Sequence, residues 1–256
     1  RSLELGVNFF DTADVYGLGL SEKRLSKILG SRRFDNIIAT KGGVQWENQK
    51  KGRAKTRFNS SESYIQSAVE DSLRRLKLDV IPIYYIHWPD PLTDISKTFE
   101  CLEKLRDQGK VLEIGCSNFS VDQIHLACEV SELSLLQLPL NLLMGGISDE
   151  MSKMCEKKKL RIVAYNSLAS GLLTGKFNSS TEFSSNDRRS RLEIFNGKNL
   201  AEALDKIEAY KEQARKKNMS LTQYSIKWAS DNDFVDSVIE GIKTKLQADE
   251  NLSILN

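Results

Sequence analysis

The stretch IPIYYIHWPDPLTDISKTFECLEKLRDQGKVLEIGCSN, residues 81–118, decides the fold class of this chain. It begins with an apolar run over Ile81–Ile86 and closes with a second run over Val111–Gly115. Between the two runs lies a helical pattern that stops at Gly109. The apolar stripe of this helix consists of Ile95, Phe99, Leu102 and Leu105. A strand, a helix and a second strand in this order predict parallel strands with a helix on the outside of the sheet.

The same alternation continues on both sides of this segment. Further strand-like runs are Val7–Phe10, Ile37–Ala39, Leu135–Leu138, Arg161–Ala164 and Ser237–Ile239. Another helical stripe, after the start signal Asn59-Ser-Ser61, consists of Ile65, Val69, Leu73 and Leu76. Ser120 with Gln123, and Ser220 with Gln223, each match a capping box that opens a helix. Several of the strand-like runs lack alternation, as expected of strands that are buried on both faces of a sheet.

This pattern leaves two fold classes, an open doubly wound sheet or a closed (β/α)8 TIM barrel. No Gly-x-Gly-x-x-Gly turn follows a strand, and the nearest approach, Gly17-Leu-Gly19, lacks the third glycine. Seven strands can be assigned, and Leu3–Gly6 resembles the last turn of a helix that leads into the first of them. We therefore expect residues 1–256 to be a single α/β barrel domain whose first strand is missing from this sequence.

Composition and charge exclude several classes of protein. The 256 residues are 40% hydrophobic and 28% charged, which is typical of a folded globular chain. Lys and Arg number 37 against 35 Asp and Glu, so nothing in the net charge of +2 indicates a nucleic-acid partner. The most apolar stretch, Leu133–Met144, is interrupted by polar residues, so no membrane span is expected. Four cysteines without a Cys-x-x-Cys pair and only two histidines predict no metal site and a cytoplasmic location.

Polar side chains stand at the carboxyl ends of the predicted strands, where barrels of this class carry their active sites. They are Asp11, Lys41, His87, Ser117, Asn118, Gln137, Tyr165 and Ser167. Each residue alone has a structural explanation, since an aspartate there commonly caps a helix and a lysine is commonly solvated. Their convergence at one barrel mouth favours chemistry, because burying Asp, Lys, His and Tyr together costs stability unless they pair.

Five blocks of sequence carry a family resemblance. They are Phe10-Asp-Thr-Ala-Asp-Val-Tyr-Gly17 with Ser21-Glu22, Thr40-Lys-Gly-Gly43, Ile86-His-Trp-Pro-Asp90, Ile114-Gly-Cys-Ser-Asn-Phe119 and Tyr165-Asn-Ser-Leu-Ala-Ser-Gly-Leu-Leu-Thr-Gly-Lys176. In order and spacing the chain resembles the aldo-keto reductases from Leu3 to Asn251. The resemblance implies that an amino-terminal hairpin is also missing from this sequence.

The resemblance implies a proton donor at Tyr16, a lysine at Lys41 that is ion-paired to Asp11, and His87 as a hydrogen-bond donor to a substrate carbonyl. The division of roles between Tyr16 and His87 stays open, because a histidine can also donate a proton. A phenol titrates near pH ~10, so a neighbouring ammonium helps it to release its proton at neutral pH. A carbonyl oxygen held between two such donors is stabilised as hydride reaches its carbon.

The hydride must come from a cofactor, since no side chain supplies one. The resemblance implies NADPH, with Ser117, Asn118 and Gln137 on the nicotinamide carboxamide and Tyr165 stacked on the ring. The segment expected to cover the pyrophosphate contains Ser167, Leu168, Ala169, Gly171, Leu173 and Lys176. The expected adenosine site contains Gly241, Lys243, Gln247, Glu250 and Asn251. Lys243 would face the 2′-phosphate, although an exposed loop lysine is the alternative explanation of this residue.

The chain also departs from its relatives beside this site. Relatives usually carry proline at the position of Glu240, Ser-Pro at Asn166-Ser167 and tyrosine at Leu140. Glu240 adds negative charge close to the expected phosphate site. It therefore bears on the affinity for the cofactor and not on the cofactor's identity.

The substrate side of the site is less defined. Trp46, Trp88 and Phe119 would line an apolar pocket for a small carbonyl compound, or they pack under the loops. The polar segment Asn178–Asn199 is expected to be a long loop. The sequence leaves the individual substrate and the oligomeric state open.

Two functions are compatible with these residues. The first is an NADPH-dependent reductase of aldehydes or ketones, reversible as an alcohol dehydrogenase. The second is a regulatory or redox-sensing subunit with the same fold, such as a channel-associated beta subunit. Relatives of the second kind typically lack the histidine, so His87 favours catalysis.

Overall fold

The computed structural model describes residues 1–47 and 54–255. The chain divides into two compact units. The first unit contains Val7–Leu138 and Ser148–Ile162, and the second contains Arg1–Gly6, Pro139–Ile147 and Val163–Asn256.

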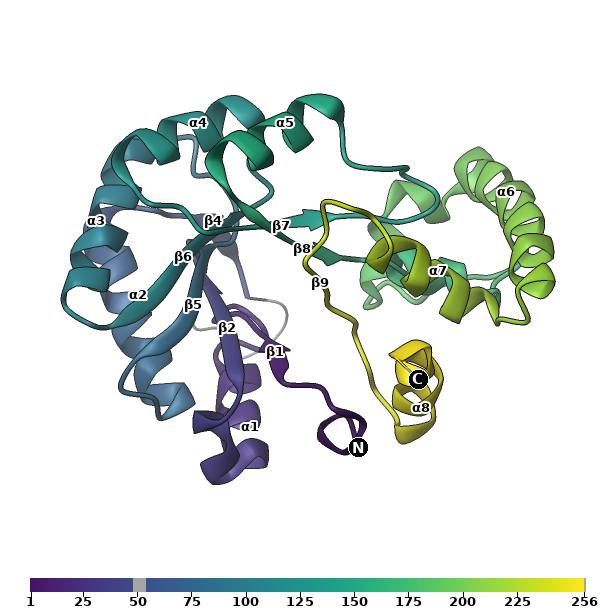
Figure 1. Cartoon of the computed structure of the whole chain (residues 1–256), viewed down its shortest axis with the longest axis horizontal. Coiled ribbons are helices and arrows are strands. Elements are labelled where there is room, and N and C mark those ends of the chain that lie inside the picture. Colours follow the sequence, from purple (N-terminus) through teal and green to yellow (C-terminus); the bar gives the residue numbers. More distant parts are fainter. Residues whose placement is uncertain (48–53, 256) are drawn as a thin grey trace. The chain divides into compact units, whose positions relative to one another are not determined.

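A parallel sheet forms the centre of the first unit (Figure 1). Its strands, in spatial order, are β1 (Phe9–Asp11), β2 (Ile37–Gly42), β5 (Ile81–Ile86), β6 (Val111–Ser117) and β7 (Leu135–Pro139). The register pairs Lys41 with Tyr85 and Ser117 with Gln137. Because all five strands run in the same direction, the polar residues at their carboxyl ends share one edge of the sheet.

Helices cover the outer side of this sheet in chain order (Figure 1). They are α1 (Leu20–Leu29), the 3₁₀ turn η2 (Gly30–Phe34), α2 (Glu62–Leu76), α3 (Ile95–Asp107), α4 (Val121–Val130) and α5 (Asp149–Lys158). The predicted apolar stripe of α2 is buried, and the predicted capping box of Ser120 and Gln123 opens α4. Amphipathic periodicity therefore decides which face of each helix meets the sheet.

Two adjacent tyrosines on β5 set the packing of the sheet. Tyr84 and Tyr85 are both fully buried, and as neighbours in a strand they point to opposite faces. A Cβ atom at Gly42 would overlap the hydroxyl of Tyr84, and one at Gly115 would overlap the ring of Tyr85. These two glycines are thus required because each large ring fills the space beside a neighbouring strand.

The second unit combines a short strand pair with helices. The end of β8 (Arg161–Tyr165) pairs in parallel with β9 (Ser237–Val238). The helices are α6 (Gly197–Lys216), α7 (Leu221–Ser230) and α8 (Lys245–Leu252), and the 3₁₀ turns are η1 (Leu3–Leu5), η3 (Ala169–Thr174), η4 (Arg188–Arg191), η5 (Glu193–Phe195) and η6 (Ser253–Leu255). The predicted capping box of Ser220 and Gln223 opens α7. Helix α7 packs against α6, α8, β9 and η3 and is the centre of this unit.

The structure differs from the sequence-based expectations in three places. Strand β2 continues to Gly42, so Lys41 lies within a strand and not after it. The antiparallel hairpin of β3 (Val44–Trp46) and β4 (Thr56–Phe58) was not predicted. In the loop expected over Asn178–Asn199, α6 already begins at Gly197, and Phe183 and Phe195 pack edge-to-face with each other.

All seven predicted strands are present, and each lies within two residues of its expected start. Within residues 1–47 and 54–255, no helix combines the length and the apolar character that crossing a membrane requires.

Candidate active site

A buried ion pair joins the ends of β1 and β2. Lys41 Nζ lies 2.5 Å from Asp11 Oδ2 and donates a second hydrogen bond to the backbone oxygen of Thr12 at 2.8 Å. The lysine side chain is only 1% exposed. Burial lowers the pKa of Lys41 below its usual value, and Asp11 opposes this shift. The structure therefore brings together the predicted Asp11 and Lys41 in a site that holds a desolvated cation.

Gln137 from β7 contacts the same carboxylate. Its Nε2 donates to Asp11 Oδ1 at 2.8 Å, so the two oxygens of Asp11 are held by different residues. Ser117 Oγ donates to the backbone oxygen of Gln137 at 2.9 Å. Sequence reasoning placed Gln137 in the cofactor site and did not foresee that it also fixes the partner of Lys41. No local signal could have revealed a contact between residues this far apart in the chain.

Tyr16 lies above this ion pair on a tight turn between β1 and α1. Its ring centre is 5.6 Å from Lys41 Nζ and 5.6 Å from the ring of His87, which it meets edge-on. Tyr16 is 43% exposed, so its phenol can reach a molecule from solvent. The backbone of His87 is fixed where its N–H donates to the oxygen of Gly42 at 2.9 Å. The four predicted catalytic residues thus form one cluster.

Asn118 borders this cluster in a left-handed conformation with φ 66°. Its Nδ2 donates to the backbone oxygen of His87 at 2.9 Å and to Ser117 Oγ at 3.0 Å. This contact connects the end of β6 to the end of β5. The predicted amide residues Asn118 and Gln137 consequently belong to the same hydrogen-bonded group as Lys41 and His87.

The three aromatic residues predicted for a substrate pocket differ in exposure. Trp88 is 40% exposed and its ring lies 6.2 Å from that of Phe58. Trp46 is partly buried on β3. Phe119 is buried and packs edge-to-face against Phe99 of α3. Trp88 is thus the member of the group that is available to a small molecule at the surface.

The second unit holds the residues predicted for the cofactor phosphates. After β8, the backbone of Ala169, Ser170 and Gly171 takes three consecutive positive φ angles of 46°, 58° and 94°. Such conformations cost energy in non-glycine residues and are concentrated at ligand sites. Ser167, Ala169 and Leu173 are buried, whereas Lys176 is exposed with its Nζ 5.0 Å from the ring of Phe177.

The residues predicted for the adenosine end lie just before α8 and within it. Lys243 is exposed, and its backbone N–H donates to Gln247 Oε1 at 2.8 Å. Glu250 Oε1 accepts a bond from Ser220 Oγ at 3.0 Å, and Asn251 is buried. Gly241 is exposed. The second unit thus presents two lysines, Lys176 and Lys243, to solvent, and Lys176 lies beside the strained segment, with its Nζ 3.9 Å from the position of a Cβ atom at Gly171.

The cluster in the first unit joins Asp11, Tyr16, Lys41 and His87 at one edge of a parallel sheet, and comparison with known proteins shows which family the chain belongs to. The model of the aldo/keto reductase family matches residues 1–256. The chain belongs to this family. The predicted (β/α)8 class is confirmed by a solved structure, the glycerol dehydrogenase AKR11B4 from Gluconobacter oxydans, which matches with a TM-score of 0.90 and 33% identity over 100% of this chain and 78% of that one.

Two relatives represent different roles within the family. The NADH-specific methylglyoxal reductase of Escherichia coli is 27% identical over 98% of this chain and 79% of its own length. A probable voltage-gated potassium channel subunit beta from Oryza sativa is 31% identical over 99% of this chain and 79% of its own length. This aldo-keto reductase is therefore similar both to enzymes and to a channel subunit.

A buried polar network beneath the Tyr16 turn was missed by the sequence reasoning. Glu22 is fully buried, and its two oxygens accept bonds from Thr40 Oγ1 at 2.6 Å and from Arg75 Nε at 2.5 Å. Arg75 also closes the space beside Gly19, where a Cβ atom would meet its side chain. Glu22, from the Ser21-Glu22 block, thus connects the start of α1 to β2 and α2 beside the turn that carries Tyr16.

Asp14 lies in the same turn without such partners. It is 1% exposed, and within residues 1–47 and 54–255 no side chain donates a hydrogen bond to its carboxyl oxygens, although the backbone N–H of Val15 lowers the pKa slightly. Burial, and secondarily the charge of Glu22, raise the pKa of Asp14 to about 8. Burial therefore favours the neutral form of this carboxyl.

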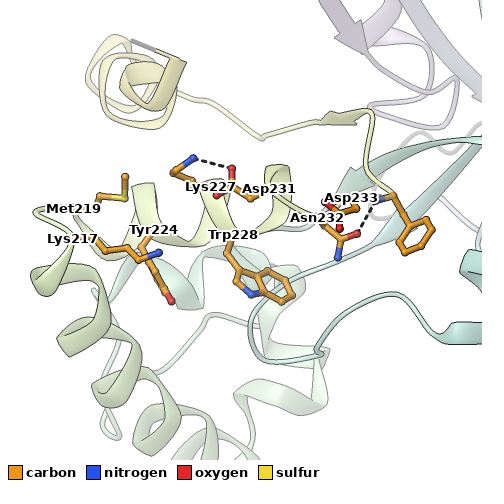
Figure 2. Close-up of a pocket in the computed structure, with 9 residues that line it drawn as sticks. Lys217, Met219, Tyr224, Lys227, Trp228, Asp231, Asn232 and Asp233 are labelled. Carbon is orange, nitrogen blue, oxygen red and sulfur yellow. Dashed lines mark hydrogen bonds and ion pairs between the residues drawn. The ribbon is translucent and has the colours of Figure 1, made fainter.

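A cavity of about 350 Å³ lies along α7, in the second unit (Figure 2). Figure 2 shows Tyr224 and Trp228 projecting from the same side of this helix, while Lys227 and Asp231 form an ion pair of 2.8 Å. The lining of this cavity includes none of the residues predicted for catalysis, cofactor binding or the substrate pocket. We assign it no part in the reaction of this aldo-keto reductase.

Proposed function

We propose that the chain is an NADPH-dependent reductase of aldehydes or ketones that also catalyses the reverse oxidation of alcohols. One observation carries this proposal: a buried Lys41–Asp11 ion pair lies 5.6 Å below the ring of an exposed tyrosine, which in turn meets His87. Methylglyoxal and glycerol, named for two similar proteins, suggest a small polar carbonyl compound or its alcohol.

The chemistry of the described residues fits a nicotinamide dinucleotide. Asn118 and Gln137 offer amides suited to a carboxamide, which has both a donor and an acceptor. Lys176 and Lys243 offer cations to phosphates, and the strained segment Ala169–Gly171 lets the backbone approach a ligand closely. When bound, NADPH would supply the hydride. Lys243 supports the choice of NADPH over NADH, as the cation that would meet a 2′-phosphate.

The proton is supplied by the protein. The Tyr16 phenol donates it to the carbonyl oxygen as negative charge develops there. Lys41 stabilises the phenolate that remains, because a desolvated ammonium interacts strongly with a nearby anion. Asp11 keeps Lys41 charged and in place, and His87 hydrogen-bonds the same carbonyl oxygen. Exclusion of water from Lys41, which is 1% exposed, is what makes its charge effective.

The decisive experiment is Tyr16→Phe, with NADPH oxidation measured over a panel of small aldehydes and ketones that includes methylglyoxal. Loss of the hydroxyl should lower turnover by at least ~100-fold while dinucleotide binding, followed by fluorescence, is retained. Tyr224→Phe is the matched control, because it removes a phenol that donates to Gln213 of α6 and is not among the predicted site residues. Unchanged turnover in Tyr16→Phe would refute the assignment of the acid.

A regulatory subunit is the second candidate, supported by the similarity to the Oryza sativa protein. It predicts that a partner protein binds equally well to wild type and to Tyr16→Phe. It also predicts that wild type oxidises NADPH with no member of the carbonyl panel. The Lys41–Asp11–Tyr16–His87 cluster favours the enzyme, because a purely regulatory chain has no need for a buried cation beneath an exposed phenol.

A further inference from the structure

Glu240 forms an unusual contact between the two strand ends of the second unit. Its carboxyl oxygen accepts a hydrogen bond from Ser167 Oγ. Ser167 is fully buried and follows β8, whereas Glu240 follows β9. The backbones of these segments are also joined, because the N–H of Ile239 donates to the oxygen of Ala164 at 2.9 Å. The sheet therefore fixes this carboxyl beside the first residue of the predicted pyrophosphate segment.

No cation in the described part of the chain pairs with this carboxyl. Burial alone raises the pKa of Glu240 to about 8, and no charged side chain of the described residues adds to this shift. The cations of neighbouring segments have other contacts. Arg189 pairs with Asp187, Lys227 pairs with Asp231, and Lys176 lies over Phe177. Lys243 is exposed and adds positive potential at Asp187.

We propose that Glu240 controls the affinity of this chain for a nicotinamide dinucleotide, accepting the cofactor's pyrophosphate as a neutral acid and repelling it as a carboxylate. This inference rests on the proposed function and names a residue that tunes it. A neutral carboxyl can share its proton with Ser167 or with a phosphate oxygen. An ionised carboxyl at Glu240 places a partly desolvated negative charge next to a dinucleotide that itself carries several negative charges. Binding must then be coupled to uptake of a proton at Glu240.

The first test is the dissociation constant of NADPH and of NADH, measured by protein fluorescence from about pH 6 to about pH 9.5. Wild-type Kd should rise above about pH 8, approaching tenfold per pH unit, for both dinucleotides because both contain the pyrophosphate. Glu240→Gln should bind at least as tightly and lose this rise. Glu212→Gln on α6, an exposed glutamate that pairs with Arg215, should keep the wild-type profile.

Calorimetry in buffers of different ionisation enthalpy gives a second readout that needs no turnover. Near pH 8, wild type should take up about half a proton on binding NADPH, and Glu240→Gln should take up none. Ser167→Ala removes a donor to the ionised carboxyl, so the rise in Kd should move to higher pH. Should Glu240→Gln fail to fold, the shift of that rise in Ser167→Ala keeps the proposal testable.

The possible failures are distinguishable. Binding of both dinucleotides with a pH-independent Kd in wild type, or the same rise in Glu240→Gln, overturns the role of Glu240 and leaves the reductase intact. If folded wild type binds neither dinucleotide at any pH, the proposed function itself is overturned, and the inference with it.

Discussion

Two strand-end carboxyls, one in each unit, have opposite partners. Asp11 of the first unit faces the ammonium of Lys41 and the amide of Gln137. Glu240 of the second unit faces the hydroxyl of Ser167 and pairs with no cation of residues 1–47 and 54–255, and burial raises its pKa to about 8. The partner therefore sets the behaviour of each carboxyl: beside the ammonium Asp11 forms an ion pair, and beside the hydroxyl Glu240 has a raised pKa.

Removing the cation that pairs with Asp11 should have the largest effect on activity and stability. Lys41→Met removes the charge beneath Tyr16 and should lower kcat/KM for carbonyl reduction by ~1,000-fold or more. It should also lower the free energy of unfolding by ~3 kcal/mol, because Asp11 is left as a partly buried charge without its cation. Steady-state kinetics and urea denaturation measure the two effects separately.

The double variant Asp11→Asn with Lys41→Met separates structure from catalysis. Replacing both partners removes the unpaired charge, so stability should return towards that of wild type while activity stays lost. Recovery of activity together with stability would mean that the ion pair is only structural.

Asp14 extends the comparison to a buried carboxyl that, among the described residues, forms no ion pair and accepts no hydrogen bond from a hydroxyl. Its pKa is raised from an ordinary value near 4 to about 8, so the folded state holds a proton that the unfolded state releases. Its contribution to the free energy of unfolding therefore falls as pH rises from about 4 to about 8, by up to about 1.4 kcal/mol per pH unit, and is constant above that range. Asp14→Asn should remove this slope and stabilise the protein near pH 8 by a few kcal/mol.

The measurement is urea denaturation of wild type and Asp14→Asn at several pH values between about 4 and 9. The difference between the two stabilities should grow with pH, which cancels the contributions of all other titrating groups. Asp107→Asn, at an exposed position at the end of α3, is the control and should show a constant difference. A difference that does not depend on pH would show that Asp14 is ionised in the folded protein.

Local sequence was sufficient for the seven parallel strands, for helices α2, α3, α4 and α7, and for the polar residues of the site. Periodicity predicted the strands because buried strands are short apolar runs, and it predicted α4 and α7 because a capping box is complete within four residues. The cluster of Asp11, Lys41 and His87 could be anticipated because parallel strands bring their carboxyl ends to one edge.

Pairings between distant segments could not be predicted in this way. Gln137 bonding to Asp11, Arg75 bonding to Glu22 and Ser167 bonding to Glu240 each depend on which strand or helix becomes a neighbour in space. Nor does the spacing of residues in the sequence show that the carboxyl of Asp14 has no side-chain partner among the described residues. Burial and partnership are properties of the packed structure, and they decide the pKa shifts on which the electrostatic argument rests.

The smallest effect is expected from removing Lys243, an exposed cation of the second unit. Lys243→Ala should raise the Kd of NADPH by about tenfold, equivalent to about 1.4 kcal/mol, and leave the Kd of NADH within about twofold. The effect is modest because Lys243 is solvent-exposed and its charge is screened, unlike that of Lys41. Lys216→Ala, an exposed lysine at the end of α6, should change neither value. Equal weakening of NADPH and NADH would place Lys243 on the pyrophosphate, where its positive charge would offset the repulsion by an ionised Glu240.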